Sequence, residues 1–264
     1  MLTIDIHTHT LSSGHGTTDT VTDLARTAYQ KGMTLLGIAD HGPATPGSCK
    51  ESYFRSLMAA PRIRSGIRLL YGIEANILDE NGNLDLSDTI LSGLDFVIAS
   101  IHPQTYQNPS CHCHSFGNRQ KTIGNMEELR HSNTLAYIHA MRNPYVTIIG
   151  HPDDTHYPID HEAFVKAASK YNVIMEVNEA SLMAGSYRGR PEDTIANMTS
   201  LLMHCRKQNL PILLSSDSHG SAGVGQAPCA EALVAQLAYP RELILNHLPA
   251  EEFITCLHRL PGEP

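Results

Sequence analysis

The sequence predicts an α/β barrel built from seven strands, and three observations lead to this prediction. Short runs rich in Ile, Val and Leu recur along the chain, segments with helical spacing separate most of them, and His or acidic residues follow them closely. Strand–helix alternation is typical of parallel strands joined by helical crossovers. Because no linker or low-complexity stretch interrupts the alternation, we expect a (β/α)7 barrel in a single domain spanning residues 1–264 rather than a two-domain design.

The strands are expected where aliphatic and β-branched residues form short runs bounded by polar residues or glycine. Such runs are typical of strands buried on both faces of a parallel sheet. They lie at about 2–7, 35–39, 68–77, 95–101, 146–150, 172–178 and 211–216.

The helices are expected in the intervening segments. Residues 20–31 have helical apolar spacing and are followed by Gly32, a residue that commonly terminates helices. Further helices are predicted at 122–142, 161–171 and 192–209. Helices at 227–238 and 249–260 are predicted to close the chain, so that a C-terminal helical part covers about 227–260.

Residues 103–121 differ from this alternation because they contain no periodic apolar pattern and much Pro, Asn and Ser. A long loop at the functional end of a barrel is more typical of a lid than of a spacer. The run Cys111-His112-Cys113-His114 within it resembles a metal site, but its spacing does not match a zinc finger. We therefore interpret it as part of a lid that picks up metal adventitiously.

The composition narrows the class of protein. With 264 residues, of which 41% are hydrophobic and 17% charged, the chain can bury a large core. A formal charge of −8 argues against a long nucleic-acid duplex as partner. Six cysteines without a CxxC pair do not indicate a disulfide framework. No signal peptide is visible, and no apolar run reaches the roughly 18 residues of a membrane span, so we expect a cytoplasmic protein.

The chain carries 16 histidines, and several of them occupy one kind of position. Nine candidate metal ligands stand at or just beyond the downstream ends of the apolar runs: His7, His9, His15, His41, Glu74, His102, His151, Asp217 and His219. In α/β barrels the functional groups collect at the C-terminal ends of the strands and in the loops that follow. The repeated placement therefore predicts one polynuclear metal centre, and imidazole with carboxylate suits zinc, manganese or iron.

Two of these pairs are informative by their spacing. His7-Thr8-His9 places two imidazoles on one face of an extended chain, so both can reach a single ion. Asp217-Ser218-His219 repeats the spacing after the last strand. Because the first and last strands are neighbours in a closed barrel, the two pairs should face each other.

Single ligands have simpler alternative explanations. Glu74 would be costly to bury alone, and it either pairs with an arginine such as Arg68 or bridges two cations. His102 and His151 are each followed by Pro, which stops the strand ladder, and each on its own is compatible with a hydrogen-bonded core histidine. Their joint occurrence favours ligands.

The motifs DIHTHT, ADHG, GIEANI, SIHP, GHPDD and SDSH resemble those of the PHP family, the polymerase and histidinol phosphatase superfamily, and most closely its YcdX-type phosphatase branch. The resemblance runs from residue 2 to about residue 220. It implies a distorted, TIM-like (β/α)7 barrel that holds three metal ions. Zinc is the first expectation for these ions, with manganese or iron as alternatives.

The resemblance also distributes the nine ligands over three ions. It implies that His7, His9, Glu74 and Asp217 hold the first ion, that Glu74, His102 and His151 hold the second with Glu74 bridging, and that His15, His41 and His219 hold the third. All nine positions carry the residue that the family motifs require.

Charge counting gives this centre a chemical role. Three divalent ions, two carboxylates and a bridging hydroxide leave a local charge of about +3, which attracts a phosphate dianion despite the acidic chain. The metal-bridging hydroxide would attack phosphorus in line. The expected catalytic residues are Glu74, Asp217 and His219, and the proton is managed either by Asp217 or by a metal-bound water.

Two arginines and two aspartates are secondary candidates. Arg188 and Arg190 follow the sixth strand, and their guanidinium groups suit phosphate; the alternative is a solvated loop with a helix-capping role. Asp5 and Asp40 precede ligand histidines and are candidates for orienting imidazoles.

These observations predict a metal-dependent phosphoesterase, a hydrolase of the phosphatase type acting on a small phosphomonoester. Histidinol-phosphate phosphatase, and a nuclease or nucleotide phosphodiesterase, are the enzymatic alternatives. A metal- or phosphate-binding sensor protein is the non-enzymatic alternative. A small phosphorylated substrate is the expected partner, without long nucleic acid or membrane, and a homo-oligomer stays open.

Overall fold

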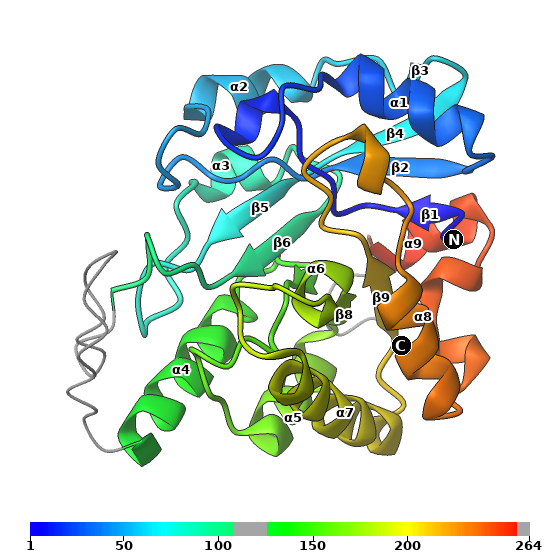
Figure 1. The fold of residues 1–264 in the computed structure, drawn as a ribbon. Coiled ribbons are helices and arrows are strands. Elements are labelled where there is room, and N and C mark those ends of the chain that lie inside the picture. Colours follow the sequence, from blue (N-terminus) through cyan, green and yellow to red (C-terminus); the bar gives the residue numbers. More distant parts are fainter. Residues whose placement is uncertain (108–125, 258–264) are drawn as a thin grey trace.

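A computed structural model describes residues 1–107 and 126–257, and its strands are surrounded by helices (Figure 1). Eight of the strands run parallel to their neighbours: β1 (Ile4–Asp5), β2 (Leu35–Ile38), β4 (Ile67–Tyr71), β5 (Ile73–Asn76), β6 (Val97–Ser100), β7 (Ile148–Ile149), β8 (Ile174–Asn178) and β9 (Ile212–Ser215). The short strand β3 (Ile63–Arg64) pairs with β4 in the antiparallel direction. Each run predicted from the sequence contains a strand, so the predicted fold class is confirmed.

The barrel is distorted because one predicted strand is split into β4 and β5. β4 pairs with β2, whereas β5 pairs with β6, so the strands form two sheets in the orders β1-β2-β4-β3 and β5-β6-β7-β8-β9. The break falls at Gly72, where a Cβ atom would lie 2.5 Å from the carbonyl oxygen of Phe96. A bridge between His41 and Glu74 joins the sheets just beyond β2. The predicted alternation of seven strands with helices is therefore present, but its third strand is split into β4 and β5, which belong to different sheets.

The seam between β1 and β9 is closed mainly by side chains rather than by a strand ladder. Beyond the strands, Thr8 and Ser218 form a single bridge. Below it, the buried Asn246 amide donates to the carbonyl oxygens of Ile4 at 2.9 Å and Leu214 at 2.8 Å. Its Oδ1 accepts from the backbone N–H of Leu214 at 2.7 Å. One amide thus satisfies backbone groups of both strands.

The interior of the barrel is a compact apolar cluster that lies beneath the site. It takes alternate residues from the strands and is closed by residues that follow β9: Ile4, Ile6, Leu35, Ala39, Leu70, Phe96, Ile98, Ile148, Ile174, Leu213, Leu245, Phe253 and Leu257. A larger apolar cluster packs around them, with residues of strands and helices. The two-residue alternation of the strands therefore separates an inner from an outer core.

The helices follow the strands as the sequence predicts. They are α1 (Val21–Gln30), α2 (Glu51–Leu57), α3 (Asp88–Leu91), α4 (Met126–Ala140), α5 (His161–Tyr171), α6 (Glu179–Leu182), α7 (Pro191–Gln208), α8 (Pro228–Gln236) and α9 (Ala250–Leu257). α1 begins with a capping box in which Thr20 and Asp23 bond reciprocally. The short helices α2, α3 and α6 were not predicted, because segments of four to seven residues show too little periodicity.

Two parts of the prediction lie wholly or partly outside the described residues. The run Cys111-His112-Cys113-His114, most of the lid predicted at 103–121 and the start of the helix predicted at 122–142 fall within 108–125. The last residues of the helix predicted at 249–260 lie beyond 257. Among the described residues, none of the helices has the length and apolar character needed to cross a membrane.

Candidate metal centre

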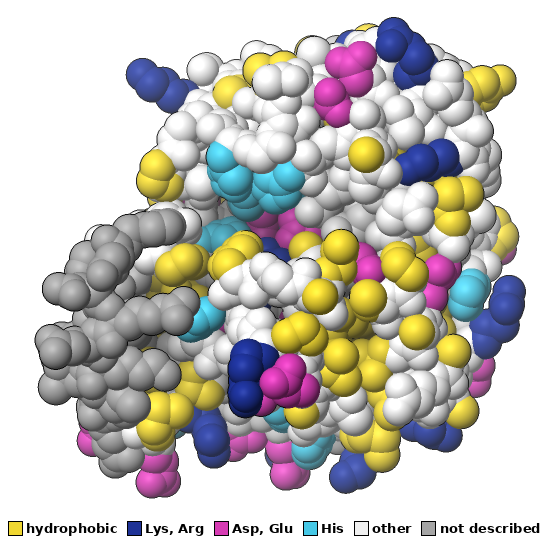
Figure 2. Space-filling model, viewed as in Figure 1, with side chains coloured by type: hydrophobic (Ala, Val, Ile, Leu, Met, Phe, Trp, Pro, Cys, Tyr) yellow, Lys and Arg dark blue, Asp and Glu magenta, His cyan; other side chains and the backbone are white. Residues whose placement is uncertain are grey.

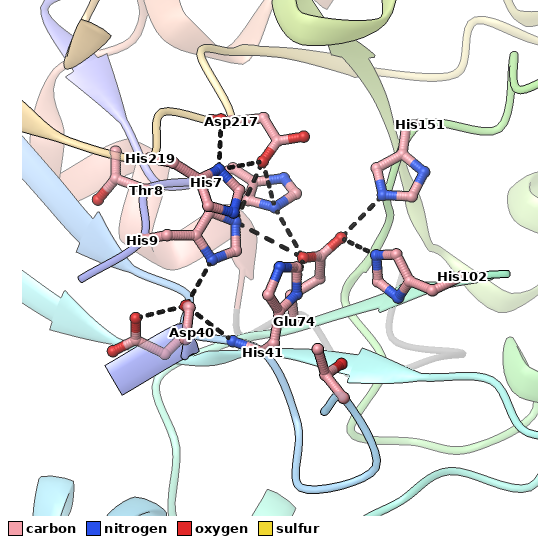
Figure 3. A network of polar contacts seen from close by, with 12 residues as sticks. His7, Thr8, His9, Asp40, His41, Glu74, His102, His151, Asp217 and His219 are labelled. Carbon is pink, nitrogen blue, oxygen red and sulfur yellow. Dashed lines mark hydrogen bonds and ion pairs between the residues drawn. The ribbon is translucent and has the colours of Figure 1, made fainter. Parts of the chain in front are cut away.

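The predicted ligands meet at the C-terminal ends of the strands, and Glu74 lies among them (Figure 3). Its Oε1 is 2.8 Å from Nε2 of His151 and 3.2 Å from Nε2 of His102. Its Oε2 is 2.7 Å from Nδ1 of His41. The carboxylate therefore contacts imidazoles from three different strand ends. Arg68, the alternative partner for Glu74, pairs instead with the exposed Glu251.

The predicted pairing of the first and last strands also brings their polar groups together. Nε2 of His9 is 3.1 Å from Oδ1 of Asp217, and Nε2 of His7 is 3.6 Å from the same oxygen. The two imidazoles lie 3.4 and 3.6 Å from Oε2 of Glu74. His7 and His9 thus stand near both carboxylates, and the His7/His9 pair faces the Asp217/His219 pair as the sequence predicts.

His15, His41 and His219 form the outer edge of the cluster. The ring of His15 lies 4.9 Å from the rings of both His41 and His219, and the ring of His219 lies 4.1 Å from that of His9. Gly16 allows this approach: its φ is +80°, and a Cβ atom there would be 2.6 Å from the His219 ring. His15 itself is exposed at the mouth of the site. Figure 2 shows His side chains gathered in a hollow, with acidic side chains deeper within it.

The backbone is strained at two of these positions. His151 has a φ of +30° and Asp217 a φ of +51°, in the left-handed region that residues with a side chain rarely adopt. Each such residue costs on the order of 1–3 kcal/mol and persists only when the surrounding contacts impose it. Strain of this kind clusters at functional sites, and both strained residues here belong to the ligand cluster.

Both carboxylates are ionised although they are buried. Burial opposes ionisation of Glu74, but His102, His7 and His41 outweigh it and hold its pKa well below the usual range. Burial likewise opposes ionisation of Asp217, but His7 and Arg188 hold its pKa well below the usual range. A pair of buried negative charges requires compensating cations.

The imidazoles differ in protonation. Burial, reinforced by His219 and His41, holds the pKa of His9 well below its usual value, and burial also lowers the pKa of His219. These rings are neutral at pH 7, as metal ligands must be. Burial lowers the pKa of His7 too, but Glu176, Asp217 and Glu74 outweigh it and raise that pKa well above its usual value. In the absence of a cation, His7 therefore carries a proton that a metal ion would displace.

The donor atoms fit a metal ion. Within the described part of the chain, six buried atoms of the ligand residues make no hydrogen bond, although Nδ1 of His41 and Oε2 of Glu74 lie 2.7 Å apart: Nε2 of His7, His102 and His219, Nδ1 of His41 and His151, and Oε2 of Glu74. Each such buried group costs about 1–3 kcal/mol if it stays unsatisfied. Three sets of ligand atoms lie within 4.8 Å of one another: His7, His9 and Asp217; His9, His41 and His219; and His41, Glu74 and His102. Nitrogen and carboxylate donors at this spacing suit zinc, manganese or iron.

The far nitrogens of two ligands are held by acceptors. Nδ1 of His102 is 2.8 Å from Oδ1 of Asn76, and Nδ1 of His9 is 3.0 Å from Oγ of Ser13. Ser13 donates its own proton to Asp40 at 2.7 Å, so it accepts from His9. Asp40 therefore orients His9 through Ser13, which agrees in outcome with its predicted role. Such contacts fix the tautomer that leaves Nε2 free for a metal.

Asp5 has a different surrounding from the one expected. It accepts from the Ser216 hydroxyl at 2.6 Å and from the backbone N–H of Gly225 at 2.8 Å. Its contact with His7 is to the backbone N–H at 3.4 Å. These contacts place Asp5 behind the ligand-bearing segments. The prediction that it orients an imidazole is not supported, because its carboxylate bonds Ser216 and Gly225 and meets only the backbone of His7.

The two predicted arginines differ. Arg188 is buried, and its Nη2 lies 2.8 Å from Oδ2 of Asp217. Its Nε has no hydrogen-bond partner among the described residues. Arg190 is exposed at the N-terminus of α7, where it bonds Asp193 at 2.8 Å. Arg188 thus stands next to the cluster, whereas the exposed Arg190, paired with Asp193, matches the alternative of a solvated loop.

Sequence reasoning missed Glu176 on β8. Its Oε1 is 2.5 Å from Nδ1 of His7, and it is fully buried. Asn178, two residues further on, donates to Oδ2 of Asp217 at 3.2 Å. A signal existed, since the run VIMEVN places a carboxylate inside an otherwise apolar strand, where it needs a partner.

A barrel with clustered imidazoles and carboxylates at the C-terminal ends of its strands is typical of hydrolases that use a metal-activated water. The model of the PHP domain family matches residues 5–181. The chain is also 38% identical over 245 residues to a protein named "probable phosphatase" of Thermoanaerobacter sp. (strain X514), covering 93% of this chain and 90% of that protein. A second "probable phosphatase", of Caldicellulosiruptor bescii, is 34% identical over 256 residues, covering 97% and 95%.

Solved structures agree on the fold. A histidinol phosphate phosphatase of Lactococcus lactis, crystallised with zinc, L-histidinol and phosphate, superposes with a TM-score of 0.55 at 16% identity, covering 90% of this chain and 94% of that one. A putative histidinol phosphatase of Listeria monocytogenes gives a TM-score of 0.54 at 16% identity, with coverage of 84% and 97%. The chain belongs to the PHP family. It is a hydrolase of the phosphatase class.

Proposed function

We propose that the protein hydrolyses small phosphomonoesters with a three-ion metal centre held by His7, His9, His15, His41, Glu74, His102, His151, Asp217 and His219. The observation that carries this proposal is the cluster of buried ligand atoms that make no hydrogen bond, around two carboxylates whose pKa values are held low. Zinc suits these donors best, with manganese or iron as alternatives. The protein's negative net charge is no obstacle, because local cations dominate the field in such a pocket.

When bound, the ions would supply water activated at neutral pH and would neutralise the phosphate charge. The residues of the chain supply the remaining functions. Glu74 and Asp217 hold the cations and keep the site compact. Asp217 also bonds Arg188, whose free Nε is available for a phosphate oxygen. His219, at the exposed edge, is placed to contact the leaving group.

A monoester is favoured over a nucleic-acid strand by the charge of −8. The Lactococcus lactis structure contains L-histidinol and phosphate, so a histidinol-phosphate phosphatase is the second candidate. Both candidates use the same centre and differ only in the alcohol that leaves.

A panel of phosphorylated metabolites tests this proposal, with the protein loaded in turn with zinc, manganese or iron. We expect turnover of at least one monoester and none by the His7→Ala/His9→Ala double variant, because that variant loses two ligands of the first ion. Cleavage of diesters or RNA without any monoester turnover would favour a nuclease. Bound metal without hydrolysis of any ester would favour a binding protein.

The two arginines provide a matched prediction. Arg188→Lys is expected to lower kcat/KM for the best monoester by about 10²-fold, since lysine cannot reproduce the planar fork that reaches both Asp217 and a phosphate. Arg190→Lys should leave kcat/KM within about twofold, since this side chain is exposed and paired with Asp193. Steady-state kinetics with both variants measure the difference. Equal losses would show that the role of Arg188 is misassigned.

A further inference from the structure

We propose that Glu176 is a positioning residue of the metal centre. It holds His7 in the tautomer whose Nε2 faces Glu74 and Asp217, and it fixes the two segments that carry His151 and Asp217. The inference rests on the metal centre proposed above and adds a residue from β8, a strand that supplies none of the nine ligands.

The carboxylate of Glu176 accepts four hydrogen bonds from four segments of the barrel. Oε1 accepts from Nδ1 of His7 and from the Ser215 hydroxyl, both at 2.5 Å. Oε2 accepts from the backbone N–H of His151 at 2.8 Å and from Nδ2 of Asn178 at 3.0 Å. The side chain is fully buried, so the protein rather than solvent supplies these hydrogen bonds.

Each hydrogen-bond partner of Glu176 either is a metal-ligand candidate, bonds to one, or lies close to one in the chain. His7 is itself a ligand, and its Nε2 is left unpartnered among the described residues. The bond to the His151 N–H stabilises the strained backbone at that position, where φ is +30°. Asn178 donates through Nδ2 to both Glu176 and Asp217. Ser215 lies two residues before Asp217 at the end of β9. One carboxylate thus couples ligands of the first and second ions.

Only a carboxylate satisfies this geometry. The backbone N–H of His151 and the side-chain amide N–H of Asn178 are obligate donors, and the Ser215 hydroxyl also donates to Glu176. A glutamine of the same shape points its NH2 group either at the N–H donors of His151 and Asn178, or at His7 and Ser215. The second orientation requires Nδ1 of His7 to accept, which places the ring proton on Nε2, the nitrogen that faces Glu74 and Asp217. Glu176→Gln should therefore misplace His7 even though the volume is unchanged.

Glu179 provides a matched control. It is also a buried carboxylate after β8, and its oxygens accept from the backbone N–H groups of Cys229 at 3.1 Å and Ala230 at 2.9 Å. Glu179→Gln creates the same clash between donors at the start of α8, away from the cluster. It should lower stability about as much as Glu176→Gln without changing metal binding.

The test is zinc affinity, measured by competition with a chromogenic chelator at a temperature where circular dichroism shows every variant folded. Glu176→Gln should lose at least tenfold in zinc affinity, in line with the usual effect of residues that orient metal ligands, and Glu179→Gln less than twofold. In a His7→Ala background the Glu176→Gln effect should shrink, because the two residues act together. Unchanged affinity in Glu176→Gln, or equal losses in both Gln variants, would overturn the inference.

Two further comparisons keep the outcome unambiguous. If Glu176→Gln does not fold, Ser215→Ala replaces it, with Ser216→Ala as control, since the Ser216 hydroxyl bonds Asp5 outside the cluster. A loss of zinc affinity in Ser215→Ala alone supports the inference, and equal affinities overturn it. A wild-type protein that binds no zinc, manganese or iron would instead overturn the proposed metal centre itself.

Discussion

Glu74→Gln is expected to lower kcat/KM for a phosphomonoester by about 10³-fold or more, equivalent to about 4 kcal/mol of transition-state stabilisation. Glutamine preserves the shape of the side chain and removes its charge. The charge matters because Glu74 contacts His41, His102 and His151 and approaches both imidazoles of the first pair. Without it, five imidazoles surround a neutral amide, and the cations lose a shared anionic ligand.

Metal content and activity should fall together in this variant. Elemental analysis of the purified protein is expected to show a loss of at least one equivalent relative to wild type. Glu179→Gln controls for the burial of an amide, because it leaves every ligand in place. Full activity in Glu74→Gln would contradict the assignment of Glu74 as the shared ligand.

Removal of the metal by a chelator should abolish activity, and re-addition of zinc should restore it more readily at pH 8 than at pH 6. The pH dependence follows from His7, whose pKa is raised well above 6.5 by Glu176, Asp217 and Glu74 against the effect of burial. Below that pKa a zinc ion must displace the proton of His7. The apparent zinc affinity therefore rises by up to about tenfold for each unit by which the pH increases.

The stability of the metal-free protein should move in the opposite direction. A histidine with a raised pKa contributes stability that is fully present below its usual value of 6.5 and is lost as the pH rises through the folded pKa. Glu74 and Asp217, with lowered pKa values, contribute stability above their usual 4.5 and 3.8, which is lost only at acid pH. The difference in Tm between the zinc-bound and the metal-free protein should therefore be larger at pH 8 than at pH 6. Equal divergence at both values would contradict a proton on His7.

The fold and the ligand cluster were predictable because both follow from local patterns. Apolar runs mark the strands, and parallel strands place their C-terminal ends together, so residues such as His102 and His151 converge without any knowledge of tertiary contacts. The split at Gly72 was not predictable, since it depends on the approach of Phe96 from the next strand.

Contacts between side chains on opposite sides of the barrel could not be predicted from the sequence. Glu176 looks like a lone acid in an apolar run until the structure shows His7, beyond the end of β1, in contact with it. Arg188 and Arg190 are two arginines only two positions apart, and the sequence does not show that Arg188 is buried while Arg190 is exposed. Asp5 was assigned to an imidazole because it precedes ligand histidines in the sequence, whereas its carboxylate bonds Ser216 and Gly225, more than 200 residues away. Each case needs the distance between segments that are remote in the chain.

The closure of the barrel by Asn246 and a single bridge has a consequence for biosynthesis. His9 and Asp217 face each other across this seam but are 208 residues apart in the chain. The early imidazoles emerge from the ribosome long before the acid that completes their set. A cation bound by both residues would cross-link the segments that follow the first and last strands. A chain that ended before Asp217 would lack this cross-link, and it would also lack a ligand needed to hydrolyse an ester.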